Sequence, residues 1–81
     1  MAYFAYILKS EIFGTYYYGS AEDVEIRLKR HNAGHVRSTK SRRPWRIHYV
    51  ERFDSRAEAY RRELFFKSIE GYKFLKEKTI I

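Results

Sequence analysis

The chain has 81 residues, enough for one compact domain with a modest hydrophobic core, so we expect a single domain over residues 1–81. Its net charge of +7 predicts a polyanionic partner, and nucleic acid fits better than a membrane because no stretch approaches the roughly 20 apolar residues of a spanning helix. The absence of cysteine excludes disulfides, cysteine-bound zinc and thiol nucleophiles, and without a basic segment and apolar run at the N-terminus we expect a cytoplasmic protein.

Two strands and a tight connection are predicted at the N-terminus. Residues 3–9 and 15–19 are rich in aromatic and aliphatic side chains, which favour strands. Gly14 lies between them, and glycine adopts backbone conformations that most residues avoid. The sequence therefore predicts an antiparallel β-hairpin with a loop over residues 10–14.

Helical spacing begins at Asp23. Val24 and Leu28 stand four residues apart, acidic residues lie near the start and a glycine follows the last turn, so we expect a helix up to about Asn32. The next segment, residues 35–43, has many cations and no apolar periodicity. It predicts a mobile surface loop that orders on a ligand.

A third strand is predicted over residues 46–53, where polar and apolar residues alternate. This alternation places four side chains on one side of the strand: Ile47, Tyr49, Glu51 and Phe53. Together with the hairpin, this strand would complete a small three-stranded antiparallel sheet.

Two helices are predicted after the third strand. Residues 55–68 begin with a capping box, Ser-Arg-Ala-Glu, in which the serine and glutamate side chains satisfy free backbone N–H groups. A shorter helix is expected over residues 70–78, with Gly71 weakening its first turn and with Tyr72 and Leu75 facing the core. The predicted fold class is therefore α+β, a three-stranded antiparallel sheet flanked by about three helices.

Positive charge is concentrated in the middle of the chain. No Asp or Glu occurs from Ile26 to Val50, although this stretch holds eight of the 17 lysine and arginine residues and all three histidines. A solvated surface is the ordinary explanation of a charge run, but this concentration favours phosphate binding. Such binding should weaken steeply with salt, because each neutralised phosphate releases counterions.

Several residues in this chain are candidates for chemistry. Arg27 and His31 stand four apart on the first predicted helix, so both project from one face. They either act together at a site or are surface cations beside the core, and spacing alone leaves both alternatives open. Tyr6 and Tyr17, on the two hairpin strands, are core residues unless they share a site.

Glu63 would project from an otherwise apolar face of the second predicted helix, with Ala59 four residues before it and Phe66 three after it. A carboxylate in such a place needs a partner. The sequence offers two alternatives, a metal ion or an ion pair with Lys67 at i+4.

The order of these residues resembles the GIY-YIG nuclease superfamily, in particular its small single-domain bacterial members of the UPF0213 type. The resemblance covers nearly the whole chain and rests on these segments: Phe4-Ala5-Tyr6, Tyr17-Tyr18-Gly19, Asp23 to Leu28, His31 to Gly34, Thr39, Arg42-Arg43-Pro44, and Arg62-Glu63 with Lys67. Phe4-Ala5 stands in place of Gly-Ile, and Ser20 stands where some family nucleases carry a lysine.

The resemblance implies a metal-dependent endonuclease that hydrolyses phosphodiester bonds in DNA, with RNA as a further substrate and DNA repair or recombination as the process. Glu63 would bind one Mg²⁺ or Mn²⁺ ion, and Arg27 would stabilise charge on the phosphoryl oxygens. Tyr6 or Tyr17 would position or deprotonate the attacking water, assisted by His31. A tyrosine with an ordinary pKa of about 10 is a poor base at neutral pH, so Arg27, His31 or the metal would have to lower that pKa, or the metal would activate water directly.

The resemblance also implies a structural role for Gly19 in the second motif. With the charge pattern, it indicates that nucleic acid contacts these residues: Arg30, Arg37, Thr39, Lys40, Arg42, Arg43 and Lys67. Two alternatives stay open, namely a nucleic-acid-binding module of the same fold that does not cleave, and a protein-interaction module whose charge serves solubility or an acidic partner.

Overall fold

The computed structural model describes residues 1–81 and shows an α+β fold with the predicted number of strands and helices. None of the helices has both the length and the apolar character that a bilayer crossing requires. The elements follow one another in this order: β1 (Tyr3–Ser10), β2 (Tyr16–Ala21), α1 (Val24–Asn32), the short 3₁₀ helix η1 (Lys40–Arg42), β3 (Trp45–Phe53), α2 (Arg56–Phe66) and α3 (Ile69–Glu77).

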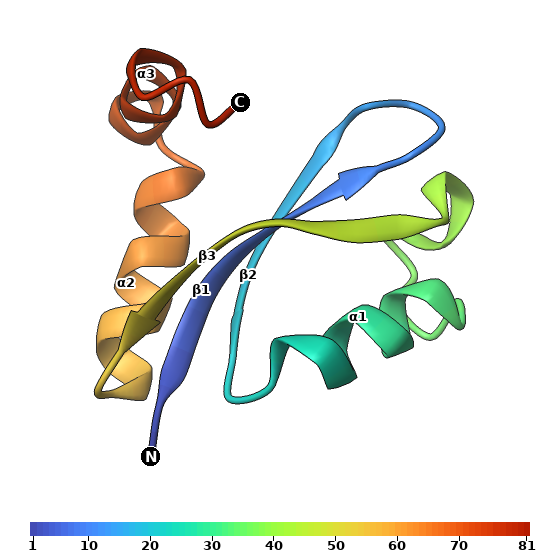
Figure 1. The fold of residues 1–81 in the computed structure, drawn as a ribbon, viewed down its shortest axis with the longest axis horizontal. Coiled ribbons are helices and arrows are strands. Elements are labelled where there is room, and N and C mark those ends of the chain that lie inside the picture. The colour runs from blue at the N-terminus through green and yellow to red at the C-terminus, as the bar shows by residue number, and fades with distance from the viewer.

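The sheet has the strand order β2-β1-β3, and both neighbours run antiparallel to the central strand β1. Side chains of β1 alternate between two cores. Ala5 and Ile7 pack with residues of α2 and α3, whereas Tyr6 and Leu8 pack with residues of α1 and β3. The two groups of helices therefore cover opposite faces of the sheet (Figure 1), which explains why β1 reads as a continuous apolar run.

One prediction about β3 is wrong, because a β-bulge interrupts the strand. Ile7 pairs with Tyr49, but its neighbour Leu8 pairs with Ile47, so His48 is an extra residue on β3. A bulge of one residue reverses the facing of the side chains that precede it. Ile47 consequently packs in the core under α1, while Tyr49 packs in the core under α2 and α3.

The segment 35–43 is also different from the prediction, which expected a mobile loop. It forms turns and the helix η1, and Thr39 at its centre is buried. The indole Nε1 of Trp45 donates a hydrogen bond of 2.9 Å to the carbonyl oxygen of Thr39, and His31 Nδ1 lies 2.8 Å from the Thr39 hydroxyl oxygen. These two contacts fix the segment to α1 and β3.

The two C-terminal helices agree with the sequence in their positions. Ser55 caps α2 by accepting a hydrogen bond from the backbone N–H of Glu58, as the capping box predicts. In α3, Leu75 is buried, but Tyr72 is 54% exposed, so the prediction that Tyr72 faces the core is wrong. Gly71 is buried against the end of α2, a contact that its helix propensity does not reveal.

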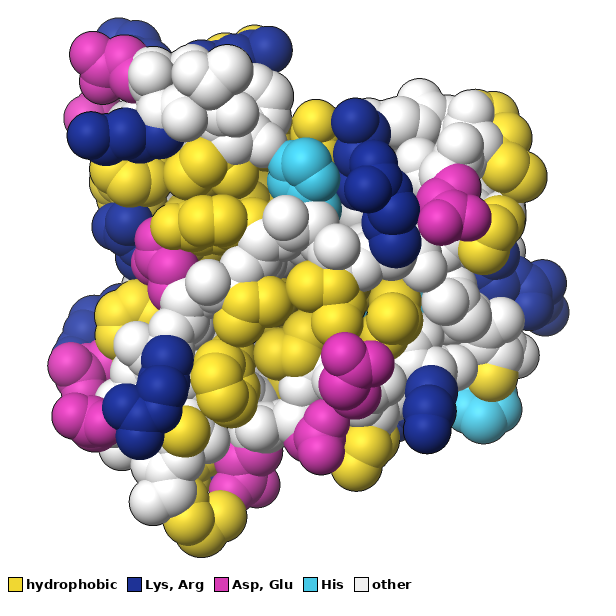
Figure 2. Space-filling model, viewed as in Figure 1, with side chains coloured by type: hydrophobic (Ala, Val, Ile, Leu, Met, Phe, Trp, Pro, Cys, Tyr) yellow, Lys and Arg dark blue, Asp and Glu magenta, His cyan; other side chains and the backbone are white.

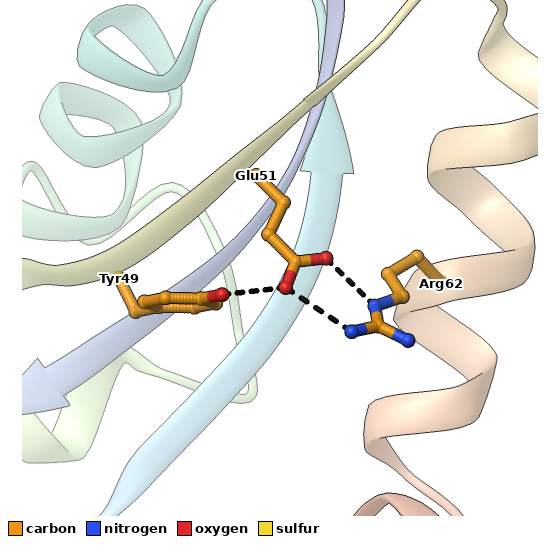
Figure 3. Close-up of polar contacts among 3 residues, drawn as sticks. All are labelled: Tyr49, Glu51 and Arg62. Carbon is orange, nitrogen blue, oxygen red and sulfur yellow. Dashed lines mark hydrogen bonds and ion pairs between the residues drawn. The ribbon is translucent and has the colours of Figure 1, made fainter. Parts of the chain in front are cut away.

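A polar network joins β3 to α2 on the face away from α1 (Figure 3). Glu51 accepts two hydrogen bonds from the Arg62 guanidinium, at 2.7 and 3.2 Å, and one from the Tyr49 hydroxyl at 2.5 Å. The same guanidinium lies 4.8 Å from the ring centroids of Phe65 and Phe74. One cation therefore ties the third strand to two helices through an ion pair and aromatic contacts.

This network predicts a stability that depends on pH. Burial alone raises the pKa of Glu51, but the hydrogen bonds from Arg62 and Tyr49 and the charge of Arg62 outweigh it, and the pKa lies below its usual value. A carboxylate with a lowered pKa stabilises the fold above the unfolded pKa of about 4.3, and this contribution is lost as the pH falls through the folded pKa. We expect Glu51→Gln to lower the free energy of unfolding by about 1–3 kcal/mol at pH 7 and by less at pH 3.

Urea unfolding followed by circular dichroism at both pH values measures this difference. Asp54→Asn is the matched control, because the ion pair between Arg52 and Asp54 is exposed and should contribute little at either pH. An equal loss at pH 7 and pH 3 in Glu51→Gln would show that the charge of Glu51 is not what stabilises the network.

Candidate active site

A cleft of about 860 Å³ lies along the β2 edge of the sheet. Helix α1 covers one face of the sheet and α2 covers the other. Residues of both helices line the cleft at this free edge, so the two helices form its walls. Tyr6, Tyr17, Arg27 and Glu63 all line it, together with Gly19. The structure therefore brings together four of the five catalytic side chains that the sequence singled out.

Helical spacing explains how the walls present their side chains. On α1, Arg27 and Arg30 are separated by three residues, with Ile26 beside them, and all three line the cleft. On α2, Tyr60 and Glu63 are separated by the same spacing. Each helix thus contributes a single face to the cleft, and the strands between them form its base.

Gly19 is required because the ring of Tyr6 lies directly against it. The two residues are paired across β1 and β2. A Cβ atom on residue 19 would lie 2.4 Å from the Tyr6 hydroxyl oxygen, which is too close for any side chain larger than hydrogen. Because Tyr6 is only 1% exposed, its ring has no room to move away. Gly19 therefore allows the Tyr6 hydroxyl to occupy its place in the cleft.

The electrostatics of the cleft keep Tyr6 protonated. Burial raises the pKa of Tyr6 to about 12, Tyr17 and Glu63 add to the increase, and Arg27 only partly opposes it. Arg27 thus lowers the pKa of Tyr6 as expected from the sequence, but by less than burial raises it. At neutral pH the Tyr6 phenol is therefore a hydrogen-bond donor rather than a base.

Glu63 has partners on both carboxylate oxygens. The Ser20 hydroxyl donates a hydrogen bond of 2.7 Å to one oxygen, and the Lys67 ammonium lies 2.7 Å from the other. The ion pair that the sequence offered as one alternative is thus present, and the hydrogen bond to Glu63 raises the pKa of Lys67. The Ser20 hydroxyl therefore fixes the orientation of the Glu63 carboxylate.

The structure places His31 behind the cleft rather than in it. His31 is fully buried, and its ring centroid lies 4.7 Å from that of Tyr17. The Thr39 hydroxyl donates a hydrogen bond to the carbonyl oxygen of Val36, so its oxygen accepts a hydrogen bond from the Nδ1–H group of His31. His31 Nε2 is then a buried acceptor with no partner. Burial, followed by the charges of Arg27 and Arg30, lowers the pKa of His31, which is neutral at pH 7.

The predicted nucleic-acid contacts do not lie together in the structure. Arg30 lines the cleft, and Lys67 is half-exposed beside Glu63. Exposed cations of the segment 35–43 lie outside the cleft: Arg37, Lys40 and Arg42. Arg43 donates hydrogen bonds to the carbonyl oxygens of Lys40 and Asn32. The prediction for Thr39 needs correction, because its side chain is buried and bonded to His31 and cannot reach a ligand.

Sequence reasoning missed several of the residues that line the cleft, among them two large apolar side chains. Tyr60 lies one turn before Glu63, and Ile26 lies next to Arg27; both line the cleft and are more than half exposed. Their spacing from the predicted residues was a usable signal, because side chains three or four apart on a helix share a face.

A second hollow of about 430 Å³ lies between β3 and the start of α1. Figure 2 shows apolar side chains gathered there with acidic side chains at their border. The apolar members include Phe4, Ile47 and Val50, and the acidic ones include Glu25. No lysine or arginine lines this hollow, so it does not suit a phosphate group, and the cleft at the β2 edge remains the candidate site.

The class of the protein follows from this fold and site together with a family comparison. A family model described as the GIY-YIG catalytic domain matches residues 2–73, which include every predicted catalytic residue. The chain belongs to the GIY-YIG family of nuclease domains.

Individual relatives place it among the small UPF0213 proteins of that family. A UPF0213 protein of Staphylococcus saprophyticus is 40% identical over 75 residues, covering 91% of this chain and 90% of the relative. One from Halobacterium salinarum is 44% identical over 57 residues, covering 69% and 74%. The solution structure of a UPF0213 protein of Bacillus halodurans is 32% identical, with a TM-score of 0.54 over 95% of this chain and 84% of that one.

Proposed function

We propose that the protein is a metal-dependent endonuclease that hydrolyses phosphodiester bonds in DNA. The observation that carries this proposal is the convergence of Tyr6, Tyr17, Arg27 and Glu63, from two strands and two helices, on one cleft. Membership of a nuclease family supports the reaction type, and the net charge of +7 supports a polyanionic substrate.

In this proposal, Arg27 stabilises the transferred phosphoryl group. A guanidinium donates two parallel hydrogen bonds to phosphate oxygens and stays charged at any working pH. Arg30, one turn further along α1, also faces the cleft and adds to the positive potential there. Fixed cations of this kind favour the transition state, in which negative charge grows on the phosphoryl oxygens.

Glu63 is the residue that would hold a divalent cation. No group of three or more His, Cys, Asp or Glu side chains is assembled to enclose an ion, so a single carboxylate would share the ion with water and the substrate phosphate. This donor set fits Mg²⁺ or Mn²⁺, which retain several waters when bound. A cation there would polarise the phosphate and acidify a coordinated water. Lys67, whose side chain is 47% exposed, has room to move away from Glu63 when an ion binds.

Tyr6 and Tyr17 have different roles in the proposed reaction. Tyr6 keeps its proton and donates a hydrogen bond that positions the attacking water or the phosphate. As the water oxygen bonds to phosphorus, the bond to the departing sugar oxygen breaks. The water's proton passes to solvent in the open cleft, and the departing oxygen takes a proton from solvent. Tyr17 lines the cleft, and His31 packs against its ring from behind and holds it in place.

A second candidate function is a nucleic-acid-binding module that does not cleave. The observation in its favour is that both oxygens of Glu63 already have protein partners, Ser20 and Lys67. Wild-type protein that binds DNA with a strong salt dependence but never cleaves it would support this candidate.

Cleavage of labelled single-stranded, nicked and branched DNA in Mg²⁺ or Mn²⁺ tests the proposal. We expect cleavage that stops on addition of EDTA, and a rate about 10²- to 10³-fold lower in Arg27→Ala because a charge-stabilising group is lost. Arg61→Ala, an exposed arginine of α2 outside the cleft, is the matched control and should cleave normally. Cleavage that survives in Arg27→Ala at the wild-type rate would identify a contaminating nuclease.

A further inference from the structure

The cleft contains two exposed apolar side chains that phosphate binding does not require. Ile26 on the α1 wall is 56% exposed, and Tyr60 on the α2 wall is 51% exposed. Both are next to a residue of the proposed chemistry, since Ile26 precedes Arg27 and Tyr60 lies one turn before Glu63. Large apolar groups left open to water beside a reaction centre indicate a ligand with an apolar surface.

The topology places these two side chains at the same end of the cleft. Strands β2 and β3 are both antiparallel to β1 and therefore parallel to each other. Each is followed at once by a helix, so α1 and α2 begin at the same end of the sheet (Figure 1). Ile26 is in the first turn of α1 and Tyr60 is in the second turn of α2, so they border the same end from opposite walls.

Charge at this end does not suit a phosphate. Glu22 and Asp23 line the cleft just before α1, and both are exposed. The arginine at this end, Arg56, holds its guanidinium 5.5 Å from the ring centroid of Tyr3. Carboxylates repel a phosphate, but they accept hydrogen bonds from the amino and imino groups of a nucleobase.

We propose that this end of the cleft binds one unstacked nucleobase between Ile26 and Tyr60, while Arg27 and Arg30 hold the adjoining phosphate. The inference rests on the proposed function and specifies its substrate class, which is DNA with an unpaired nucleotide beside the scissile bond. The cleft volume of about 860 Å³ has room for a nucleotide as well as a phosphate. A base paired inside a duplex would have to be extruded first, which disfavours intact duplex.

Equilibrium binding in Ca²⁺, with 2-aminopurine in a single-stranded oligonucleotide, tests the base site without requiring cleavage. We expect the base to stack on Tyr60 and its fluorescence to fall on binding. Tyr60→Ala should weaken single-strand binding about 10- to 100-fold and abolish the fluorescence change, because stacking on an aromatic ring is lost. Tyr60→Phe should keep both, and binding to fully paired duplex should not respond to either substitution.

Two controls separate this inference from the proposed function. Tyr72→Ala removes an equally exposed tyrosine on α3, outside the cleft, and should bind as the wild type does. A strand with abasic nucleotides should bind the wild type and Tyr60→Ala alike. If the wild type cleaves DNA but Tyr60→Ala binds single strands as tightly as the wild type does, the base site is overturned and the proposed nuclease function is not. Failure of the wild type to bind any DNA would overturn both.

Discussion

Glu63→Gln should lower the rate of metal-dependent cleavage by about 10²- to 10³-fold while leaving the fold intact. The amide oxygen of glutamine can still accept the hydrogen bond from Ser20, so the side chain should stay in place. The negative charge that would hold a divalent cation is lost, and the ion pair with Lys67 is lost with it. Single-turnover cleavage across a Mg²⁺ titration measures the effect, and thermal unfolding of the same sample confirms the fold.

Two further variants show which of these losses matters. Lys67→Ala removes the ion pair but keeps the carboxylate, so cleavage that persists in it assigns the loss to the charge of Glu63 itself. Glu77→Gln neutralises an exposed carboxylate at the end of α3, outside the cleft, and controls for the change in net charge. If Glu63→Gln cleaves DNA at the wild-type rate, Glu63 has no role in the mechanism and the proposed cation site is wrong.

Gly71→Ala should destabilise the fold by about 3 kcal/mol, although helix propensity predicts the opposite sign. In an exposed helix, replacing glycine with alanine stabilises by about 1 kcal/mol. Here, however, a Cβ atom would lie 1.7 Å from the backbone carbonyl oxygen of Phe65 and 2.9 Å from the Cα atom of Phe66. Backbone atoms cannot rotate away as a side chain can, so α3 would have to leave its place against the end of α2.

Urea unfolding of the purified variant measures this loss. Gly14→Ala provides a comparison, because nothing lies within 4 Å of the added Cβ and only the backbone conformation, with φ of +68°, opposes it. That substitution should cost about 1–2 kcal/mol, clearly less than the change at Gly71. A gain in stability for Gly71→Ala would mean that α3 packs differently from the arrangement described above.

The sequence predicted elements well where one local signal decided the structure. The hairpin, the capping box before α2 and the helix after Asp23 depend on residues close together in the chain, and all three are present. The facing of β3 could not be predicted in the same way. Polar and apolar residues alternate along the whole of β3 in the sequence, and the extra residue His48 reverses the facing of the side chains without a visible break in that pattern.

The residues of the candidate site were also predicted only in part. Residues that bear charge or belong to a family motif, such as Arg27 and Glu63, were identified before their positions in space were known. The burial of His31 could not be predicted, because it depends on contacts with Thr39 and with Tyr17 of strand β2. Contacts between residues distant in sequence decide burial, and burial in turn decides the protonation of both His31 and Tyr6.

The anchoring of Thr39 has a consequence for any ligand that the cationic segment 35–43 would bind. A disordered loop loses conformational freedom when it binds, and that loss reduces its affinity. Here the loss occurs when the domain folds, because Trp45 and His31 hold the segment in place before any ligand arrives. Its three arginines and one lysine are therefore attached to a backbone that is already in place, and the association should follow rigid-body kinetics instead of folding coupled to binding.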